Sequence, residues 1–234
     1  VARLGGKRMN SNDGGAELRL VVPGDQIDAP PGTQPGSGVC KRGDSLVATK
    51  LGELKIGGDV AHVVPTFTKY LPRSGDLVIG YVEAVMNNLW FLDVGGPFNA
   101  LLPMSLAPWK VEFGAAREHM GYGDAVLARV MEVDETHSVV ATMKGVGLRK
   151  IKEGVIFEMP PHLMGLVIGS NGRTLQRLKT ASDCRIINTQ NGRILIDGNS
   201  KGIAIARRAL QMIEETGHAP GLHSRLNGIL GDDE

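Results

Sequence analysis

The six residues VIGSNG, at positions 167–172, decide how the C-terminal third of this chain folds. Two glycines three positions apart, Gly169 and Gly172, interrupt a stretch that otherwise has a helical apolar period. Glycine is a poor helix former and readily adopts left-handed backbone conformations. The sequence therefore predicts two short helices, His162–Ile168 and Arg173–Ala181, with a glycine loop between them.

The elements on either side of this loop follow in a definite order. An apolar strand before the helices, Val155–Glu158, ends at two prolines. After the helices, two strands flank Asn191-Gly192, a dipeptide typical of hairpin turns, at Arg185–Asn188 and Arg193–Ile196. A long helix with one apolar stripe closes the segment at Lys201–Glu215. The predicted order is β-α-α-β-β-α.

In this order the loop resembles the I-G-x-x-G signature of a type I KH domain. The resemblance implies a loop that clamps about four nucleotides of single-stranded RNA. Glycines suit close approach to a sugar-phosphate backbone, and the next helix turns its N-terminal N–H groups toward a phosphate. The alternative is a glycine-rich turn between helices. The candidate RNA-binding residues are Ile168, Gly169, Ser170, Asn171, Gly172, Arg173, Arg177 and Arg185.

The charge pattern agrees with an RNA site in this segment. The whole chain carries a formal net charge of only +1, so any nucleic-acid site must be a local patch. Between Leu148 and Thr216, basic residues outnumber acidic ones by eleven to six. Arg173 and Arg177 stand four positions apart on the second helix, and therefore on one face of it. The alternative for any single arginine is a solvated surface position.

A second block of short strands precedes the KH-like segment. Five strands in about 70 residues, with a long and partly helical connection between the third and fourth, are the layout of an OB-fold barrel. The predicted strands are Leu77–Val85, Leu89–Val94, Phe98–Leu102, Asp124–Val133 and Ser138–Lys144. The first and fourth of these resemble the repeating strands of S1-type RNA-binding barrels.

In S1-type barrels an outward aromatic residue on the second strand stacks on a base. Alternation predicts that Trp90 faces the core, and that Phe91 and Asp93 face water. Phe91 is then the stacking candidate, the alternative being a contact with a neighbouring domain. Arg129 and Lys144 complete the candidate set. This barrel departs from the family at three positions, because Asn88 replaces a second aromatic, Pro103 a histidine and Ser138 an arginine.

The N-terminal part is predicted to hold a small β-rich domain. Short apolar runs divided by turn residues occupy Leu18–Val22, Ser45–Thr49, Leu51–Ile56 and Val60–Val64, with a loop rich in proline and glycine at 29–38. The expected organisation is a flexible arm (1–17), this docking domain (18–68), the barrel (69–144), the KH domain (145–216) and a C-terminal tail that loses its period and ends acidic (217–234).

No motif in the sequence indicates catalysis. The six histidines are scattered, no P-loop or HExxH stretch occurs, and no acidic or cysteine cluster has metal-ligand spacing. We therefore expect no enzyme activity, no cofactor and no metal. Cys40 and Cys184 stand alone, which fits two free thiols in a reducing cytoplasm. No apolar run approaches the ~20 residues that a membrane helix needs.

Domain order narrows the resemblance further. A β-rich domain, an S1-type barrel and one KH domain within one chain resemble the S1/KH cap subunits of the RNA exosome, of the archaeal type because the glycine loop is intact. The resemblance covers Leu18 to about Thr216 and includes the start LVVPGD at 20–25. It implies a non-catalytic subunit, present in three copies, that docks on a ring of RNase PH-like subunits and threads RNA 3′ ends into it.

Two other families share these modules, and a third interpretation needs no partner. Polynucleotide phosphorylase has its KH domain before its barrel and needs catalytic domains. Bacterial antitermination factors carry two KH domains after a barrel, and this chain has room for one. A free-standing RNA chaperone or a regulator of transcription or translation stays open as the alternative function.

Overall fold

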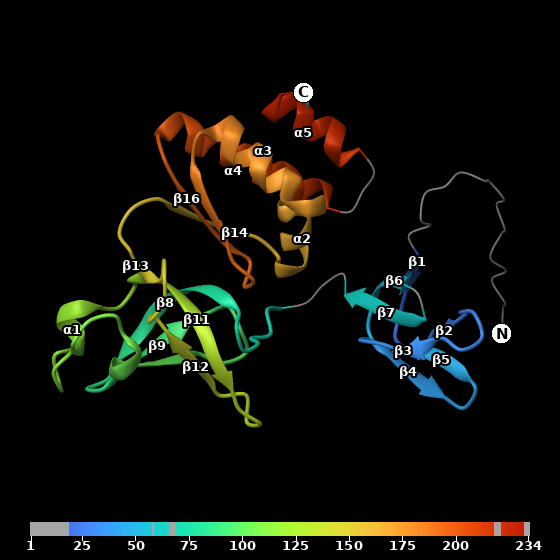
Figure 1. Ribbon diagram of the computed structural model, residues 1–234, viewed down its shortest axis with the longest axis horizontal. Helices are drawn as coiled ribbons and strands as arrows, with labels where there is room; N and C mark the ends of the chain where they lie inside the picture. Colours follow the sequence, from blue (N-terminus) through green and yellow to red (C-terminus); the bar gives the residue numbers. More distant parts are fainter. Residues whose placement is uncertain (1–18, 58, 66–68, 218–220, 232–234) are drawn as a thin grey trace, which may run out of the picture. The chain divides into compact units, whose positions relative to one another are not determined.

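The computed structural model describes residues 19–57, 59–65, 69–217 and 221–231. The chain forms two compact units, residues 1–67 and 68–234 (Figure 1). The predicted fold class, mixed β and α+β with an OB-type barrel and a KH domain, is confirmed. The predicted arm at 1–17 lies outside the described residues. Within the described part, no helix is long and apolar enough to cross a membrane.

The N-terminal unit consists of two small sheets. One has the strand order β1-β6-β7-β3 and the other β2-β5-β4. The strands are β1 (Arg19–Val21), β2 (Gln26–Ile27), β3 (Gln34–Pro35), β4 (Val39–Arg42), β5 (Ser45–Ala48), β6 (Gly52–Gly57) and β7 (Val60–Pro65). A core of small aliphatic side chains, including Val21, Leu46 and Val63, is buried between them.

The predicted loop at 29–38 contains a strand. Strand β3 runs parallel to β7, and the Gln34 and Gly36 N–H groups donate to the carbonyl oxygens of Asp59 and Ala61 at 2.6 and 2.8 Å. Strand β3 is only two residues long and lies between residues that favour turns, so it has no periodicity of its own. Pairing with a strand about 25 residues away makes them a strand, so the local sequence could not show it.

The barrel is a closed sheet of five strands. Its order is β12-β10-β9-β8-β11, and pairing of β11 with β12 closes the ring. The strands are β8 (Leu77–Val85), β9 (Leu89–Asp93), β10 (Ala100–Pro103), β11 (Ala125–Val133) and β12 (Val139–Thr142). A short helix, α1 (Ala116–His119), lies in the long connection between β10 and β11. The third strand begins two residues later than predicted, because the turn after Gly95 extends through Phe98, whose side chain is 56% exposed.

The alternation predicted for the second strand is confirmed. Trp90 and Leu92 are fully buried, and the Trp90 Nε1–H donates to the Met120 carbonyl at 3.1 Å. Phe91 lies on the outer face and is partly exposed. Asp93 also lies on the outer face, where its side chain is 40% exposed and also binds Arg193.

A further strand, β13 (Arg149–Ile151), extends the barrel sheet. It pairs with the first half of β11, whereas β12 pairs with the second half. These residues fall in the segment that the sequence analysis assigned to the KH domain. The Lys150 ammonium also binds the Asp124 carboxylate at 2.6 Å, which fastens this strand to the barrel.

The KH domain has the predicted order of elements. Its sheet, β14-β16-β15, comprises β14 (Val155–Glu158), β15 (Arg185–Asn188) and β16 (Arg193–Asp197). Its helices are α2 (Met164–Ile168), which follows a 3-10 turn, α3 (Arg173–Ser182) and α4 (Ser200–Thr216). Apolar side chains of one sheet face, such as Ile194 and Ile196, form a buried core with Val167, Leu178 and Leu210 of the helices.

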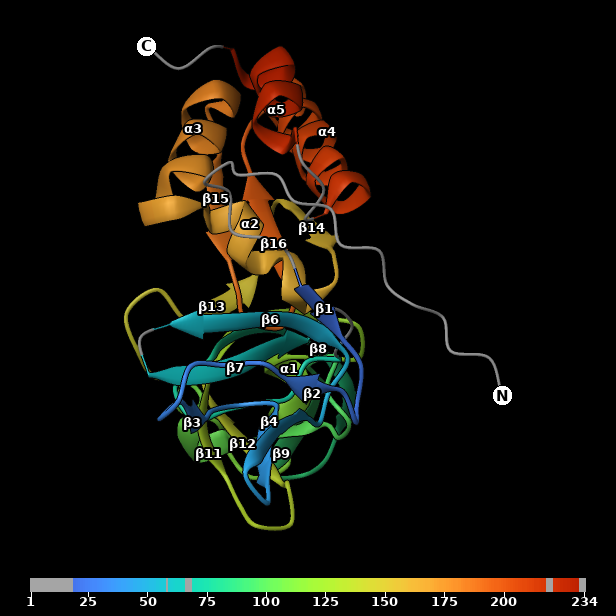
Figure 2. The same cartoon turned by 90° about the vertical axis from the view of Figure 1, so that its right-hand side faces the viewer.

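The other face of the KH sheet packs on the barrel. Leu195 is fully buried there against Ile79 of β8 and Leu127 of β11, with Ile156 and Ile187 beside it. Figures 1 and 2 both show α3 and α4 on the side of the KH sheet away from the barrel. The barrel and the KH domain therefore share an apolar core and form one body.

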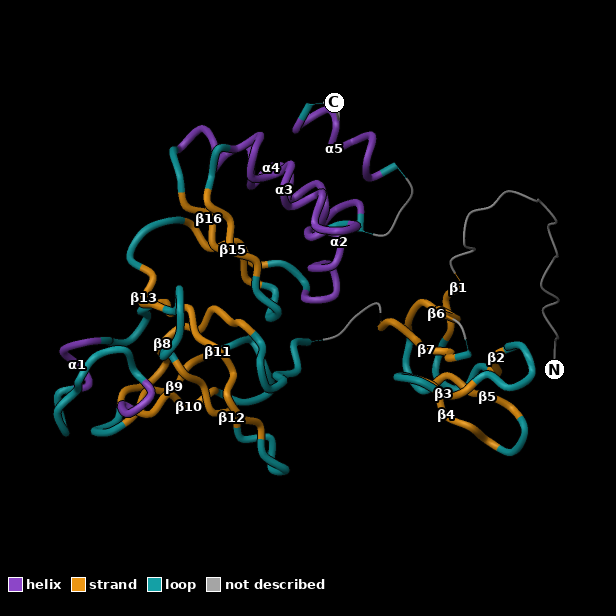
Figure 3. The backbone as a smooth tube through the Cα atoms, in the orientation of Figure 1, coloured by secondary structure: helices purple, strands orange, loops and turns teal. Residues whose placement is uncertain are grey.

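The C-terminal tail, in which the sequence shows no clear period, contains helix α5 (Leu222–Leu230). Figure 3 shows it in purple beside α4. Leu226 is 1% exposed, and Leu222, Ile229 and Leu230 pack around it on the KH core. A nine-residue helix is marginal by itself, so packing against α3 and α4 stabilises it.

Candidate nucleic-acid interface

The glycine loop has a backbone that few other residues would allow. Gly169 has φ 71° and ψ 178°, and Gly172, the residue before α3, has φ 77°. A Cβ atom at Gly169 would lie 2.7 Å from the Thr174 Cβ, which is too close for any side chain. Asn171 between them is also left-handed, with φ 53°, a region that asparagine tolerates. The first glycine is therefore needed for the loop to lie against α3.

The loop exposes small groups next to the first turn of α3. Ser170 and Asn171 are exposed, and Ile168 before them is 41% exposed. No side chain caps the start of α3, so no side chain occupies the N–H groups of its first turn. Such N–H groups and the helix dipole attract an anion. The loop therefore offers a phosphate both access and hydrogen-bond donors.

The three arginines predicted for this site lie in different surroundings. Arg173 is exposed in the first turn of α3, directly beside the loop. Arg177 points to the C-terminal helix instead, and its Nη2 donates to the Asn227 side chain at 2.9 Å and the Gly231 carbonyl at 2.6 Å. Arg185 is exposed at the start of β15, beyond the far end of α3, which is about 15 Å long. The structure brings only Arg173 to the loop.

The predicted barrel residues are also spread over the surface. Phe91 pairs with Leu101 on one side and Ala84 on the other. Arg129 pairs with Leu77 at the opposite end of β8, about 20 Å away along the strand, and donates to the Gly75 carbonyl at 2.7 Å. Lys144 is exposed just after β12. These three residues do not form one compact site.

Sequence reasoning missed a polar cluster that joins the barrel to the KH domain. Arg193, counted among the basic surface residues, has a side chain only 9% exposed. Its Nη2 binds Asp93 at 2.6 Å and its Nε binds Glu158 at 2.9 Å, while Nη1 donates to the carbonyls of Ile79 and Asp93. The guanidinium also lies over the Tyr81 ring, 4.6 Å from its centre.

The Asn191-Gly192 turn takes part in the same contact. The predicted hairpin is confirmed, and its turn packs against strand β8 of the barrel. The buried Asn191 amide donates to the carbonyls of Ile79 and Val94 at 2.8 and 3.0 Å. Gln190 exchanges two hydrogen bonds with the backbone of Leu77. This turn therefore orients the KH domain relative to the barrel.

One signal in the sequence could have revealed this contact. Ile186-Ile187 and Ile194-Leu195-Ile196 are unbroken apolar runs, whereas a sheet with one face in water alternates. Arg193 lies on the same face as Leu195, so a covered second face predicts a covered Arg193.

The environment of Asp93 lowers the pKa of its carboxyl group. Burial on its own raises the pKa, but hydrogen bonds from Arg193 and from the Gly95 N–H, together with the charge of Arg193, outweigh it. A lowered pKa in the folded state stabilises the protein at pH values above the carboxyl's unfolded pKa of about 4. That stabilisation is lost as the pH falls through the folded-state pKa.

Replacing Arg193 by methionine is expected to lower the free energy of unfolding of the barrel–KH unit by about 2–3 kcal/mol near pH 7. The change leaves buried carbonyls and the carboxylates of Asp93 and Glu158 without their donor, although both carboxylates keep contact with water. Chemical denaturation followed by circular dichroism measures this decrease in the free energy of unfolding. The difference from wild type should begin to shrink below about pH 4 and should shrink further as the pH falls through the lowered folded-state pKa of Asp93.

Arg185→Met is the matched control, since Arg185 is exposed in the same sheet. Equal destabilisation by the two variants would contradict the role assigned to Arg193.

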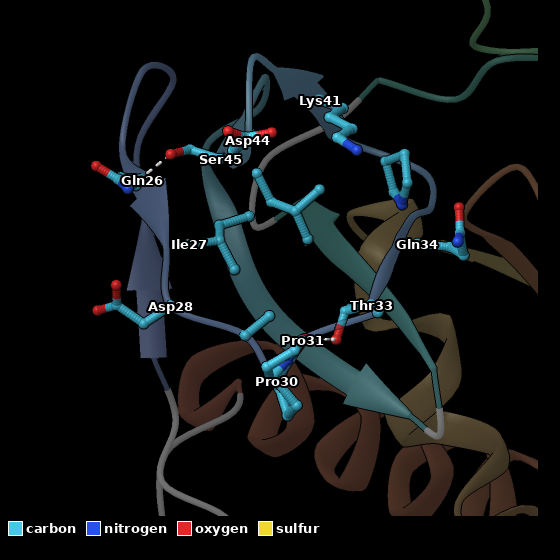
Figure 4. A pocket seen from close by; sticks show the side chains of 14 residues that line it. Gln26, Ile27, Asp28, Pro30, Pro31, Thr33, Gln34, Lys41, Asp44 and Ser45 are labelled. Carbon is cyan, nitrogen blue, oxygen red and sulfur yellow. Dashed lines mark hydrogen bonds between the residues drawn. The ribbon is translucent and has the colours of Figure 1, made fainter.

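The N-terminal unit has a cleft of its own, of about 410 Å³ (Figure 4). Its rim is closed by internal hydrogen bonds, from Gln26 to Ser45 at 2.9 Å and from Thr33 to the Pro30 carbonyl at 2.8 Å. The labelled lining contains two acidic residues, one lysine and no aromatic ring. This composition does not favour RNA. Within the described residues, no group of three or more metal-ligating side chains occurs.

Comparison with known proteins agrees with the geometry. The KH domain family model matches residues 154–212. A crystal structure assigned as an exosome complex RNA-binding protein superposes with a TM-score of 0.63 at 31% identity, covering 70% of this chain and 95% of the other.

Full-length relatives extend the match over most of the sequence. The exosome complex component Rrp4 of Thermoplasma acidophilum is 33% identical over 213 residues, which cover 91% of this chain and 89% of that protein. Rrp4 of Methanosarcina mazei is 32% identical over 217 residues, which cover 93% and 83% respectively. This chain belongs to the Rrp4 family of exosome complex components.

Proposed function

We propose that this protein is a non-catalytic cap subunit that recruits single-stranded RNA and threads its 3′ end into a phosphorolytic ring of RNase PH-like subunits, with three copies on each ring. The observation that carries the proposal is the uncapped start of α3 beside the exposed Ser170 and Asn171, in a KH domain held rigidly on a barrel. Candidate contacts are those predicted from the sequence, with Arg173 and Phe91 foremost.

A rigid barrel–KH body suits delivery of a strand in a fixed direction. RNA held at the KH loop would leave the domain at a set angle to the barrel, because Arg193 and Asn191 fix the two together. A flexible connection would let the bound strand point in any direction, at an entropic cost for each productive encounter. The rigid connection supports threading rather than simple storage of RNA.

The N-terminal unit is proposed to dock on the ring. Strand β1 is the edge of its sheet, and Leu20 and Val22 on its outer side are 63% and 48% exposed. Leu51, beside them at the start of β6, is 39% exposed. An exposed edge strand with apolar side chains can pair with or pack against a partner.

Deleting residues 1–68 is expected to abolish association with the RNase PH-like subunits while leaving RNA binding by the remaining unit largely intact. Size-exclusion chromatography with the purified ring measures the first effect and fluorescence anisotropy with a labelled oligonucleotide the second. Leu20→Glu with Leu51→Glu should weaken ring association without removing a domain. Normal stoichiometry with the truncated chain would place the docking surface elsewhere.

The same preparations test whether the subunit itself is an enzyme. The chain alone, with Mg²⁺ and phosphate, should leave a 3′-labelled RNA intact. When the chain is added to the ring, phosphorolysis of the same RNA should be faster than with the ring alone. RNA binding without any ring association would favour the alternative, a free-standing RNA chaperone or regulatory protein.

A further inference from the structure

A cleft of about 620 Å³ opens at one end of the barrel, where β10 and β12 end. Its walls come from the connection that follows β10 and from Lys144 after β12. Met104, Trp109 and Val111 provide its apolar surface, and Lys110 joins Lys144 at its rim. Neither the KH loop nor Phe91 lines it.

The aromatic ring in this cleft is held in a fixed position. Trp109 is partly buried, with one part packed against the barrel core. The His119 ring of α1 stacks on it, with centroids 5.5 Å apart and planes 15° from parallel. The Lys150 ammonium lies 3.3 Å from the His119 carbonyl, which ties α1 to β13. A ring with a fixed orientation loses little entropy when a flat ligand stacks on it.

The charge of the cleft is positive. Lys110 and Lys144 are both exposed, and within the described residues neither ammonium has a carboxylate within ion-pair distance. Among the residues that the structure describes, no acidic side chain lines the cleft. Packing against the core explains the buried part of Trp109, but it gives no reason for two exposed lysines from separate segments at the same cleft.

We propose that this cleft is a binding site for one nucleotide of single-stranded RNA, with its base against Trp109 and flanking phosphates at Lys110 and Lys144. Aromatic rings interleaved with cations are the usual means of binding single strands without reading sequence. The proposal rests on the proposed RNA-binding function and names a second place on the barrel where RNA is held.

The register of the barrel strands connects this site to Phe91. Phe91 pairs with Leu101, and Pro103 lies two residues further along β10, about 7 Å away. Met104, the next residue, lines the cleft. Leu101 and Pro103 are partly exposed on the same outer face as Phe91. One strand of RNA can therefore pass from Phe91 into the cleft along a continuous apolar surface.

Tryptophan fluorescence of the full chain reports directly on this site. The chain has two tryptophans, and Trp90 is fully buried, so stacking of a base is expected to quench Trp109. Titration with a short oligouridine should quench the emission of the wild type with the same midpoint as anisotropy. Trp109→Phe should remove the quenching while RNA still binds.

Lysine variants test the same site without touching the core. Lys110→Ala with Lys144→Ala should weaken RNA binding about threefold to tenfold. It should also reduce the slope of log affinity against log salt by about 1.4, or roughly 0.7 for each phosphate that no longer pairs with a lysine. Lys50→Ala with Lys55→Ala, two exposed lysines of the N-terminal unit, is the matched control and should leave both quantities unchanged.

The outcomes separate this site from the function on which it rests. Two results together would overturn the proposal. The Lys110/Lys144 variant would bind RNA with the affinity and the salt slope of the wild type, and saturating RNA would not quench Trp109 in the wild type. If Ser170→Asp with Asn171→Asp still weakened binding in that case, the KH-based function would stand and only the cleft would be excluded. Quenching by purified ring subunits but not by RNA would also overturn it, by assigning the cleft to a protein.

Discussion

Replacing Trp90 by alanine is expected to lower the free energy of unfolding of the barrel–KH unit by about 3–5 kcal/mol. Trp90 is the largest fully buried side chain of the barrel, and its Nε1–H donates to the Met120 carbonyl. The substitution leaves a large cavity and an unpaired buried acceptor. Urea denaturation followed by circular dichroism measures the decrease in stability.

Phe91→Ala is the matched control on the neighbouring position. Phe91 lies on the outer face, so its removal should change stability much less and should weaken binding of single-stranded RNA by about 1–3 kcal/mol if the ring stacks on a base. The opposite result would contradict the assignment of the two faces. In that case Trp90→Ala would weaken RNA binding, and Phe91→Ala would change only the stability.

Replacing Ser170 and Asn171 by aspartate is expected to reduce RNA affinity by about tenfold to a hundredfold, the second large effect. Two carboxylates would occupy the place proposed for a phosphate, and would compete with it for the N–H groups at the start of α3, which no side chain caps. The salt dependence of binding should flatten because the protein then binds fewer phosphates. Melting should change little, because acidic residues near a helix N-terminus are favourable by about 0.3–1 kcal/mol.

Both substitutions are compatible with the loop backbone. Aspartate tolerates the left-handed conformation of Asn171 much as asparagine does, and Ser170 is exposed. Gly169 is a poorer target, since any side chain there collides with Thr174 and confuses folding with binding.

The structure also decides how this experiment is done. A KH fragment cut at 145–216 would expose the sheet face that the barrel covers and would lack α5. The assay therefore uses the full chain, with and without Phe91→Ala to remove binding by the barrel. Thr49→Asp with Gln211→Asp, at two exposed positions outside the loop and α3, adds the same charge as a control. If the Ser170→Asp/Asn171→Asp variant binds RNA as tightly as the wild type, the loop is only a structural turn.

Local patterns predicted those elements whose signals lie within one segment. The strands Leu77–Val85, Val155–Glu158 and Arg185–Asn188 have the predicted bounds, because each is an apolar run stopped by turn residues. The glycine loop was predictable because Gly169 and Gly172 interrupt a helical period. Trp90 was correctly placed in the core because side chains alternate along a strand.

Elements that depend on distant partners escaped prediction. Strand β3 forms by pairing with β7, β13 by pairing with β11, and α5 by packing on α3 and α4. Each is short, and a short segment has little intrinsic preference of its own. Their formation follows from contacts that the local sequence does not contain.

The sequence by itself determined that this chain carries a barrel followed by a KH domain with an intact glycine loop. Only the tertiary structure decided which charged residues are free to meet RNA. Arg193 and Lys150 counted as surface charge in the sequence, yet they bind carboxylates of the barrel, while Arg177 binds the C-terminal helix. A side chain's charge is local, but its exposure depends on which distant segment packs over it, and periodicity within one segment cannot reveal that.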